Sequence, residues 1–278
     1  MLDLVRVRQV VGAALEEDIG RRDVTTEASV PSEARARGTL VAKQDLVLAG
    51  GVVAHEAFRL LDPGAAWESS EPDGRFFRAG ESLGIVSGRA RALLSAERVA
   101  LNFLQRLSGV ATLTRRFVET VAGTRARIRD TRKTTPLLRD LEKYAVEVGG
   151  GVPHRSRLDS GVLVKDNHIR LAGGVQRAVQ LLKEAGPEMP IEVEAQSLEQ
   201  VDEAIAAGAD IILVDNLPIE AIRDAVKRVN GRAKIELSGG VTLDRIPELA
   251  KTGATYVSVG ALTHSAPAAD LSFELEPE

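Results

Sequence analysis

Apolar and polar positions in the second half of the chain follow two alternating periods. From about residue 127, short apolar runs typical of buried strands are each followed by a segment with apolar residues at every third or fourth position, which is typical of a helix. Six strand-like runs and five helix-like segments succeed one another. This order predicts a parallel sheet covered by helices, either doubly wound or curled into a barrel. We favour an α/β barrel with fewer than eight strands.

Local signals mark where several of these helices begin and end. Pro136, Ser197 and Thr242 each stand at an expected first turn. Upstream of Gly109 the apolar positions have helical spacing, and this glycine is expected to cap the helix before a second helix begins around 111–123. Both helices are expected to bridge two domains.

The segments before about residue 90 mix both periods. A helical opening extends to about Leu15, a strand-like segment covers 38–50, and a helix-like segment covers 52–62. Turn residues dominate 68–84. This mixture predicts a small α+β unit at the N-terminus.

Composition limits the classes of function. A chain of 278 residues with 44% apolar content is long enough for one large barrel or two moderate domains. The absence of cysteine excludes disulfides and thiolate metal sites and is typical of a reducing compartment. With no signal-peptide pattern and no apolar stretch of membrane-spanning length, a cytoplasmic protein without membrane contact is expected. The 36 basic and 40 acidic residues, with only 3% aromatics, argue against nucleic-acid binding.

Polar residues gather where the strand-like runs end. The carboxyl ends of barrel strands carry the active sites of barrel enzymes, because the loops there vary while the barrel fixes them. These polar residues therefore predict the wall of a site. They are Arg129, Arg132, Lys133, Lys165–His168, Glu192, Glu194, Asp215, Asn216, Glu236 and Ser238.

Three kinds of group in and near this set predict a sugar-phosphate ligand. The cations of IRDTRKT, VPHRSR and VLVKDNH suit carboxylates or phosphates. Glu194 and Asp215 could hold Mg²⁺, bond sugar hydroxyls or stabilise a developing positive charge. Turns at the last two strand ends could cradle a phosphate with backbone N–H groups. These turns contain Ser238, Gly239, Gly240, Gly260 and Ala261.

Each feature also has a purely structural explanation. Arg129, Arg155 or Arg157 could be a solvated surface charge, and the glycine turns could be tight turns only. The histidines of the basic segments could lie at the surface or behind the site. Glu192 and Glu194 lie on the same side of one strand and would repel each other, so one of them could pair structurally outside the site.

Seven blocks of the sequence resemble one enzyme family. They are AERVALNFLQRLSGVAT (96–112), RDTRKTTPLLRDLEKYAVEVGGGVPHR (129–155), VLVKDNH (162–168), IEVEAQSLEQ (191–200), ILVDN (212–216), ELSGG (236–240) and VSVGALTHS (257–265). In these blocks the chain is similar to quinolinate phosphoribosyltransferase, the carboxylating nicotinate-nucleotide pyrophosphorylase. The resemblance covers nearly the whole chain, and the DTRKT and KDNH blocks are its most specific part.

The resemblance implies an architecture and an activity. The architecture is an N-terminal α+β sandwich domain with a bridging helix (1–108), an incomplete α/β barrel of six to seven strands (109–267) and a C-terminal tail (268–278), whose return to the N-terminal domain is one option. A homodimer with shared sites is implied, with a higher oligomer left open. The implied reaction, in NAD biosynthesis, converts quinolinate and phosphoribosyl pyrophosphate to nicotinate mononucleotide, pyrophosphate and CO₂, with Mg²⁺ as cofactor.

The resemblance also assigns residues. Lys133, Lys165, Glu194 and Asp215 are expected to act in catalysis by positioning and charge, without a covalent enzyme intermediate, and the two carboxylates are the expected Mg²⁺ ligands. Ser238, Gly239, Gly240, Gly260 and Ala261 are the expected phosphate-binding residues. The expected substrate-binding residues are Arg132, Lys133, His154, Arg155, Lys165, Asp166, His168, Glu194 and Asp215, with Arg98 reaching in from a second subunit.

Two departures from the family pattern are present, and several different functions stay open. Arg22 and Ala195 stand where family members often have glycine and valine, and neither falls on an expected charged contact. A paralogous family associated with molybdenum transport shares the fold. The residues would also suit a sugar-phosphate aldolase or isomerase that uses Lys165, a non-catalytic anion-binding regulator, or a protein that binds RNA through VPHRSR.

Overall fold

The chain forms two compact units. The computed structural model describes residues 2–186 and 188–278. Each unit combines segments that are distant in sequence. The first unit holds the N-terminal residues through Arg115, Thr134–Gly150 and Leu262–Glu278, and the second holds Arg116–Lys133 and Gly151–Ala261.

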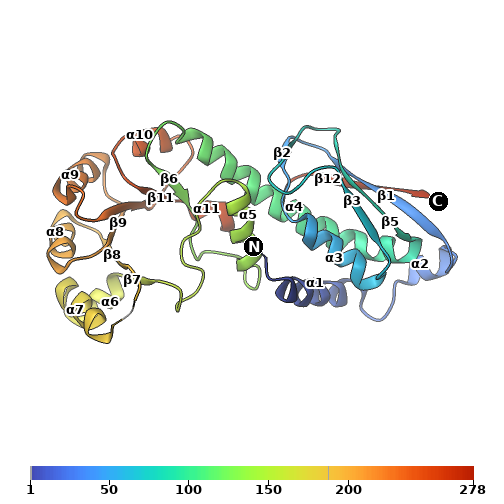
Figure 1. The fold of residues 1–278 in the computed structure, drawn as a ribbon, viewed down its shortest axis with the longest axis horizontal. Helices are drawn as coiled ribbons and strands as arrows, with labels where there is room; N and C mark the ends of the chain where they lie inside the picture. The colour runs from blue at the N-terminus through green and yellow to red at the C-terminus, as the bar shows by residue number, and fades with distance from the viewer. Residues whose placement is uncertain (1, 187) are drawn as a thin grey trace. The chain divides into compact units, whose positions relative to one another are not determined.

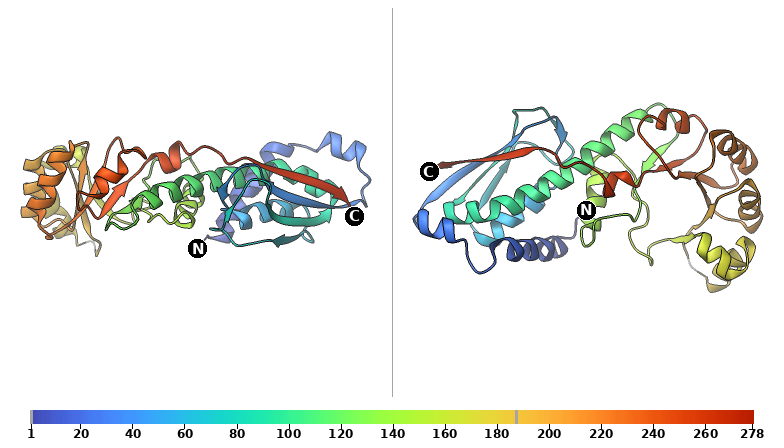
Figure 2. Two further views of the ribbon diagram at one scale, coloured as in Figure 1. Left: turned by 90° about the horizontal axis from the view of Figure 1, so that it is seen from above. Right: turned by 180° about the vertical axis from the view of Figure 1, so that it is seen from behind.

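An antiparallel sheet with the strand order β12-β1-β5-β3 forms the base of the first unit (Figure 1). Its strands are β1 (Arg35–Ala42), β3 (Ala66–Ser69), β5 (Ser82–Arg89) and β12 (Leu271–Pro277). Every second residue of β1, from Ala36 to Ala42, is buried, as expected for a strand with one face on a core. β12 pairs with β1 over its whole length, so the C-terminal segment lies beside the N-terminal strands (Figure 2).

A small ribbon and several helices complete the first unit. The ribbon pairs β2 (Leu46–Val47) with β4 (Phe76–Phe77). The helices are α1 (Leu4–Ile19), α2 (Val24–Ser29), α3 (Gly51–Leu61), most of α4 (Ala90–Thr120), α5 (Arg139–Val148) and most of α11 (Ala261–His264). The turn-rich stretch 68–84 contains β4 and the ends of two neighbouring strands, which its glycine and serine content conceals.

The helix break expected at Gly109 is wrong. α4 continues without interruption from Ala90 to Thr120. A Cβ atom at Gly109 would lie 2.0 Å from the carbonyl oxygen of Pro267. The glycine therefore permits a close backbone approach and does not end the helix. The boundary expected after residue 108 falls inside this continuous helix.

Replacing Gly109 by alanine is expected to destabilise the protein. The added methyl group would overlap a backbone carbonyl, and overpacking of this kind costs about 1–3 kcal/mol. Gly12→Ala in α1 is the matched control, since its Cβ would meet no atom within 4 Å, and we expect a gain of about 0.5–1 kcal/mol from helix propensity. Urea unfolding of both variants measures the difference. Equal stability of the two variants would contradict the proposed role of Gly109.

A six-stranded parallel sheet with the order β6-β11-β10-β9-β8-β7 forms the second unit. Its strands are β6 (Arg127–Arg129), β7 (Val162–Val164), β8 (Ile191–Ala195), β9 (Ile211–Asp215), β10 (Lys234–Ser238) and β11 (Tyr256–Ser258). The first strand pairs with the last, β11, while no ladder of described residues joins it to β7. This arrangement confirms the predicted incomplete barrel.

Helices lie along the outer face of the curved sheet (Figure 1). They are α6 (Asp166–Ala172), α7 (Val175–Ala185), α8 (Leu198–Ala207), α9 (Ile219–Val229) and α10 (Ile246–Ala250). The helix start predicted at Ser197 is confirmed, because its hydroxyl accepts a hydrogen bond from the N–H of Gln200 at 3.2 Å. The inner face of the sheet carries side chains of the core and of the site.

The helix start predicted at Pro136 is wrong, since α5 begins at Arg139. The loop before it is held by Glu142, whose carboxylate accepts hydrogen bonds from the N–H (3.0 Å) and the hydroxyl (2.7 Å) of Thr135. Leu137 has a positive φ of 67°, which interrupts helical geometry. A contact with a side chain from the next turn thus delays the helix.

The second unit departs from prediction at two further points. The polar run Lys165–His168 was placed at a strand end, but its last three residues already form the first turn of α6. The helix start predicted at Thr242 is wrong, because this residue opens a turn closed by the N–H of Arg245 on its carbonyl at 3.1 Å. α10 begins only at Ile246.

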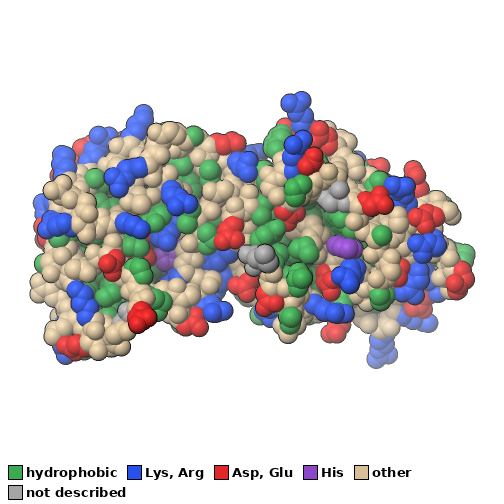
Figure 3. Space-filling model, in the orientation of Figure 1, with side chains coloured by type: hydrophobic (Ala, Val, Ile, Leu, Met, Phe, Trp, Pro, Cys, Tyr) green, Lys and Arg blue, Asp and Glu red, His purple; other side chains and the backbone are tan. Residues whose placement is uncertain are grey.

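The surface carries charges of both signs. On the face in Figure 3, basic and acidic side chains are interspersed and no large basic patch is visible. Among the described residues, no helix is both long enough and apolar enough to cross a membrane.

Candidate active site

A cavity of about 320 Å³ opens at the carboxyl ends of the strands of the second unit. The parallel ladders put these strand ends at one edge of the sheet, so side chains from distant segments converge there. The lining residues are Thr131, Arg132, Lys133, His154, Arg155, Leu163, Lys165, Glu194, Leu213, Asp215, Glu236, Ser238 and Ser258. The cavity thus has both basic and acidic groups in its walls.

Two arginines on one wall have buried donors that the protein does not use. The Nε atoms of Arg132 and Arg155 are buried and have no hydrogen-bond partner in the described chain. Burial lowers the pKa of Arg155, and the neighbouring charge of Arg132 lowers it further. An anion with two or more acceptor oxygens would satisfy these donors and relieve the repulsion between the two guanidinium groups.

Two carboxylates lie on the acidic wall. Burial raises the pKa of Glu194, the charge of Lys165 opposes the shift, and the nearby Asp215 raises it again. The Nζ atom of Lys165 lies 3.9 Å from a carboxylate oxygen of Glu194. The two carboxylates repel each other and offer hard oxygen donors, so a bound Mg²⁺ would suit them.

Asn216 sets the orientation of Asp215. Its Nδ2 donates to the Asp215 carboxylate at 2.9 Å, and its own backbone has a positive φ of 55°. A Cβ atom on Gly239 would lie 2.1 Å from Asn216 Oδ1, so glycine is required at that position. The sequence had marked Asn216 only as one polar residue at a strand end.

A buried cluster lies beside the cavity. Glu192 does not line the cavity; its Oε2 lies 3.0 Å from Nε2 of His154. Glu236 is fully buried and pairs with Arg129 and Ser258. Of the two glutamates on β8, one therefore reaches the cavity while the other pairs structurally. Arg129 is paired and half-buried, and its guanidinium carbon lies 4.0 Å from the centre of the Tyr256 ring.

Comparison with known proteins identifies the family. The model of the quinolinate phosphoribosyl transferase N-terminal domain matches residues 23–108, and that of the C-terminal domain matches residues 110–274. The chain belongs to the quinolinate phosphoribosyltransferase family.

Similar proteins of this family span almost the whole chain. A Bacillus subtilis protein named probable nicotinate-nucleotide pyrophosphorylase (carboxylating) is 42% identical, over 98% of this chain and 94% of its own length. A Mycobacterium leprae nicotinate-nucleotide pyrophosphorylase (carboxylating) is also 42% identical, over 96% of each chain. The crystal structure of NadC from Streptococcus pyogenes is 40% identical, with a TM-score of 0.96 over 100% of this chain and 99% of that one.

Some residues expected from the quinolinate phosphoribosyltransferase pattern do not line the cavity. Asp166 and His168 belong to the first turn of α6, where His168 Nδ1 accepts the N–H of Lys165 at 2.9 Å. Arg98 lies exposed on α4 in the first unit. The turn residues Gly239, Gly240, Gly260 and Ala261 also lie outside the lining, so their contact with a phosphate stays a prediction.

Three polar lining residues were missing from the predicted site, as were the apolar Leu163 and Leu213. Glu236 had been noted as a strand-end residue but had no assigned role, and Ser258 and Thr131 had not been singled out. A signal for Glu236 was available, since a glutamate within an apolar strand must have buried partners. Serine and threonine gave no comparable signal.

Proposed function

We infer that the protein transfers the phosphoribosyl group of phosphoribosyl pyrophosphate to quinolinate with decarboxylation, giving nicotinate mononucleotide, pyrophosphate and CO₂. The observation that carries this inference is the pair of buried, unpartnered arginine donors in a cavity that is also lined by two carboxylates. Quinolinate has two adjacent carboxylates, which suit Arg132 and Arg155. The acidic wall suits a ribose that gains positive charge. Family membership independently supports the same reaction.

The chemistry divides between substrate and protein. The ring nitrogen of quinolinate forms a bond to ribose C1 while the bond from C1 to pyrophosphate breaks, and pyrophosphate leaves with the electron pair. Glu194 and Asp215 stabilise positive charge at the ribose, and Lys133 and Lys165 offset the negative charge of the leaving group or quinolinate. CO₂ then leaves from C2, its electron pair remains beside the cationic ring nitrogen, and a solvent proton takes its place.

Mg²⁺ is the proposed cofactor. Glu194 and Asp215 would hold it, because their oxygens are the hard donors that this cation prefers and their mutual repulsion would be relieved. When bound, Mg²⁺ would neutralise charge on the pyrophosphate. Lys165 lies beside Glu194 and Asn216 bonds Asp215, so both carboxylates also have protein neighbours of their own.

Product formation tests the proposed function. Purified protein would be mixed with phosphoribosyl pyrophosphate, Mg²⁺ and either quinolinate or nicotinate, and nicotinate mononucleotide and CO₂ would be measured. We expect product from quinolinate only, with one CO₂ released per product. Failure to convert quinolinate, in folded protein that still binds phosphoribosyl pyrophosphate, would contradict the inference and favour an anion-binding regulator or the paralogous family.

A homodimer with shared sites is proposed from the first unit. Arg98 is exposed on α4, and its neighbour Val99 lines a groove of about 480 Å³ between α1, α4 and the loop 135–138. Leu137 in that loop is 77% exposed although it is apolar. A second copy seated on this groove would cover Leu137 and could receive Arg98 in its own cavity.

Mixing two inactive variants tests the shared site. Arg98→Ala and Lys133→Ala are each expected to abolish activity, but random heterodimers would contain one intact site, so about a quarter of wild-type activity should return after subunit exchange. Lys133→Ala mixed with Lys165→Ala is the control. Both residues line one cavity, so every mixed site keeps a defect and no activity should return. Equal recovery in both mixtures, or recovery in neither after proven exchange, would contradict sharing.

A further inference from the structure

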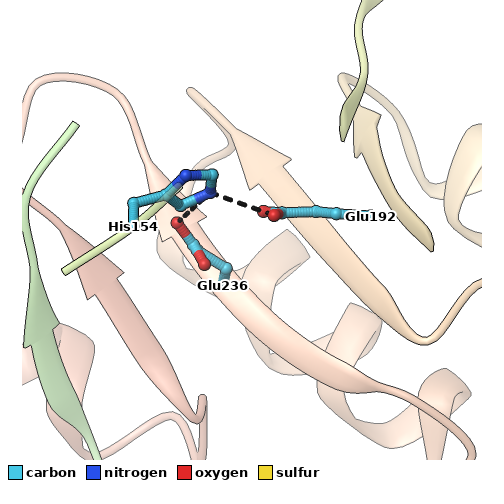
Figure 4. Close-up of side chains that lie close together, drawn as sticks. All are labelled: His154, Glu192 and Glu236. Carbon is cyan, nitrogen blue, oxygen red and sulfur yellow. Dashed lines mark hydrogen bonds and ion pairs between the residues drawn. The ribbon is translucent and has the colours of Figure 1, made fainter. Parts of the chain in front are cut away.

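The ring of His154 has protein partners on both nitrogens. The backbone N–H of Arg155 lies 2.8 Å from Nδ1, and a backbone N–H can only donate, so Nδ1 is the acceptor. A histidine that accepts at Nδ1 is neutral and carries its proton on Nε2. Nε2 lies 3.0 Å from Glu192 Oε2 and 3.7 Å from Glu236 Oε1 (Figure 4). The Nε2 proton is therefore donated to Glu192.

Glu236 is held in place by other groups. Arg129 donates to one of its carboxylate oxygens and Ser258 to the other. Burial and the charge of Glu192 raise the pKa of Glu236, whereas Arg129 lowers it. Hydrogen bonds and one ion pair therefore join β6, β10 and β11 at Glu236, while Glu192 on β8 bonds the segment that carries His154.

The spacing of the cluster would also suit a metal ion, but its hydrogen bonds argue against one. Ligand atoms of His154, Glu192 and Glu236 lie within 4.8 Å of one another. A metal would need the Nε2 lone pair, whereas the tautomer inferred from the Arg155 N–H contact carries a proton there. Arg129 already supplies positive charge to Glu236, so a divalent cation would be repelled there.

Arg155 is the residue that this arrangement fixes. Besides its N–H on the His154 ring, its Nη1 donates to the carbonyl of Gly161 at 2.9 Å. The N–H of His154 is anchored on the buried carboxylate of Asp130 at 2.8 Å. The guanidinium of Arg155 is thus held through Nη1, while its buried Nε has no partner in the described chain. That donor is available to a substrate carboxylate.

We propose that Glu192 is a positioning residue for quinolinate: by accepting the Nε2 proton of His154 it fixes the ring tautomer, which holds the backbone of Arg155 and aims its guanidinium at a substrate carboxylate. His154 is a positioning residue in the same chain of contacts. The proposal rests on the proposed function for the identity of the carboxylate. Its structural part, the tautomer, stands without it.

Nuclear magnetic resonance tests the tautomer directly. The chain has four histidines, so the ring signals of ¹⁵N-histidine-labelled protein can be assigned by losing one at a time, with His154→Asn identifying the signal of interest. We expect the neutral Nε2–H form in the free protein and no change on saturation with quinolinate. An imidazolium or an Nδ1–H form would overturn the proposal, as would a change of form on saturation. Loss of the Nε2 proton on adding Zn²⁺ would also overturn it and indicate a metal site at His154.

Two substitutions of Glu192 test the link to substrate binding. Glu192→Gln keeps an oxygen that accepts the Nε2 proton, whereas Glu192→Met keeps the approximate size without an acceptor. We expect KM for quinolinate to rise about tenfold or more in the methionine variant, because one charge-assisted hydrogen bond contributes about that much. In the glutamine variant, KM should stay within about threefold of wild type. KM for phosphoribosyl pyrophosphate and kcat should change little in both. Glu203→Gln on exposed α8 is the control and should match wild type.

The outcomes separate this proposal from the proposed function. Equal effects of glutamine and methionine, or a loss shared by kcat and both KM values, would indicate a merely structural role and overturn the proposal. If the methionine variant fails to fold, the tautomer of the wild-type protein and the kinetics of the glutamine variant still test the proposal. A wild-type protein that makes no product from quinolinate would refute the proposed function, while the tautomer measurement would keep its meaning.

Discussion

Arg132→Gln is expected to lower kcat/KM for quinolinate by about 30- to 5,000-fold. Removing one partner of a buried charge pair costs about 2–5 kcal/mol, and each 1.4 kcal/mol is about tenfold. Arg132 has a buried Nε without a protein partner, so the protein offers no substitute for the lost contact. Of the two arginines that line the cavity, only Arg155 would then be left for two substrate carboxylates. Steady-state kinetics with quinolinate as the varied substrate measures the effect.

Arg157→Gln is the matched control for this prediction. Arg157 lies near Arg155 in the sequence but is 72% exposed, and its ion-pair partner Asp159 is equally exposed. Exposed pairs contribute about 0–1 kcal/mol, so we expect kcat/KM to stay within about threefold of wild type. If Arg157→Gln had as large an effect as Arg132→Gln, the substrate would be bound by positive charge in general. A defined pocket formed by particular arginines would then be contradicted.

Glu194→Gln is expected to lower kcat by about 100- to 1,000-fold, the usual cost of removing one preorganised group that stabilises transition-state charge. Glutamine keeps the shape and can still accept the 3.3 Å hydrogen bond from Gln196. What it removes is the negative charge beside Asp215 and Lys165. The concentration of Mg²⁺ that gives half-maximal activity should rise in the same variant. Chelation of Mg²⁺ should abolish turnover of the wild type.

Glu203→Gln controls for the loss of a carboxylate elsewhere in the second unit. Glu203 is exposed on α8 and does not line the cavity, so kcat and the Mg²⁺ dependence should not change. A Glu194→Gln variant with normal kcat would contradict charge stabilisation by this residue. If Glu194→Gln lowers kcat but leaves the Mg²⁺ dependence normal, Glu194 acts on the ribose and does not bind the metal.

The barrel was predictable because its signals are local. A parallel strand buried on both faces must be apolar along its length, and a helix packed on it must be apolar on one side, so alternation alone indicated β6 to β11 and their helices. The cap at Ser197 is equally local, because it needs only a hydroxyl and an N–H three residues away.

Long-range contacts account for what the sequence did not show. Gly109 was expected to end a helix, yet its missing side chain accommodates Pro267, which is distant in sequence. Pro136 was expected to begin a helix, but the carboxylate of Glu142 binds Thr135 and keeps the segment before Arg139 out of the helix. Each residue carried a familiar local signal, and a tertiary contact outweighed that signal.

The sequence by itself determined the family, the barrel and the strand ends at which charged residues meet, because periodicity and motifs are properties of neighbouring residues. Only the tertiary structure decided which of those charges face the cavity and which hold it together. Glu192 and Glu194 are two residues apart on one strand, yet one pairs with His154 and the other reaches the cavity. That difference depends on partners brought in from other strands, and burial without a partner costs too much for either carboxylate to be left alone.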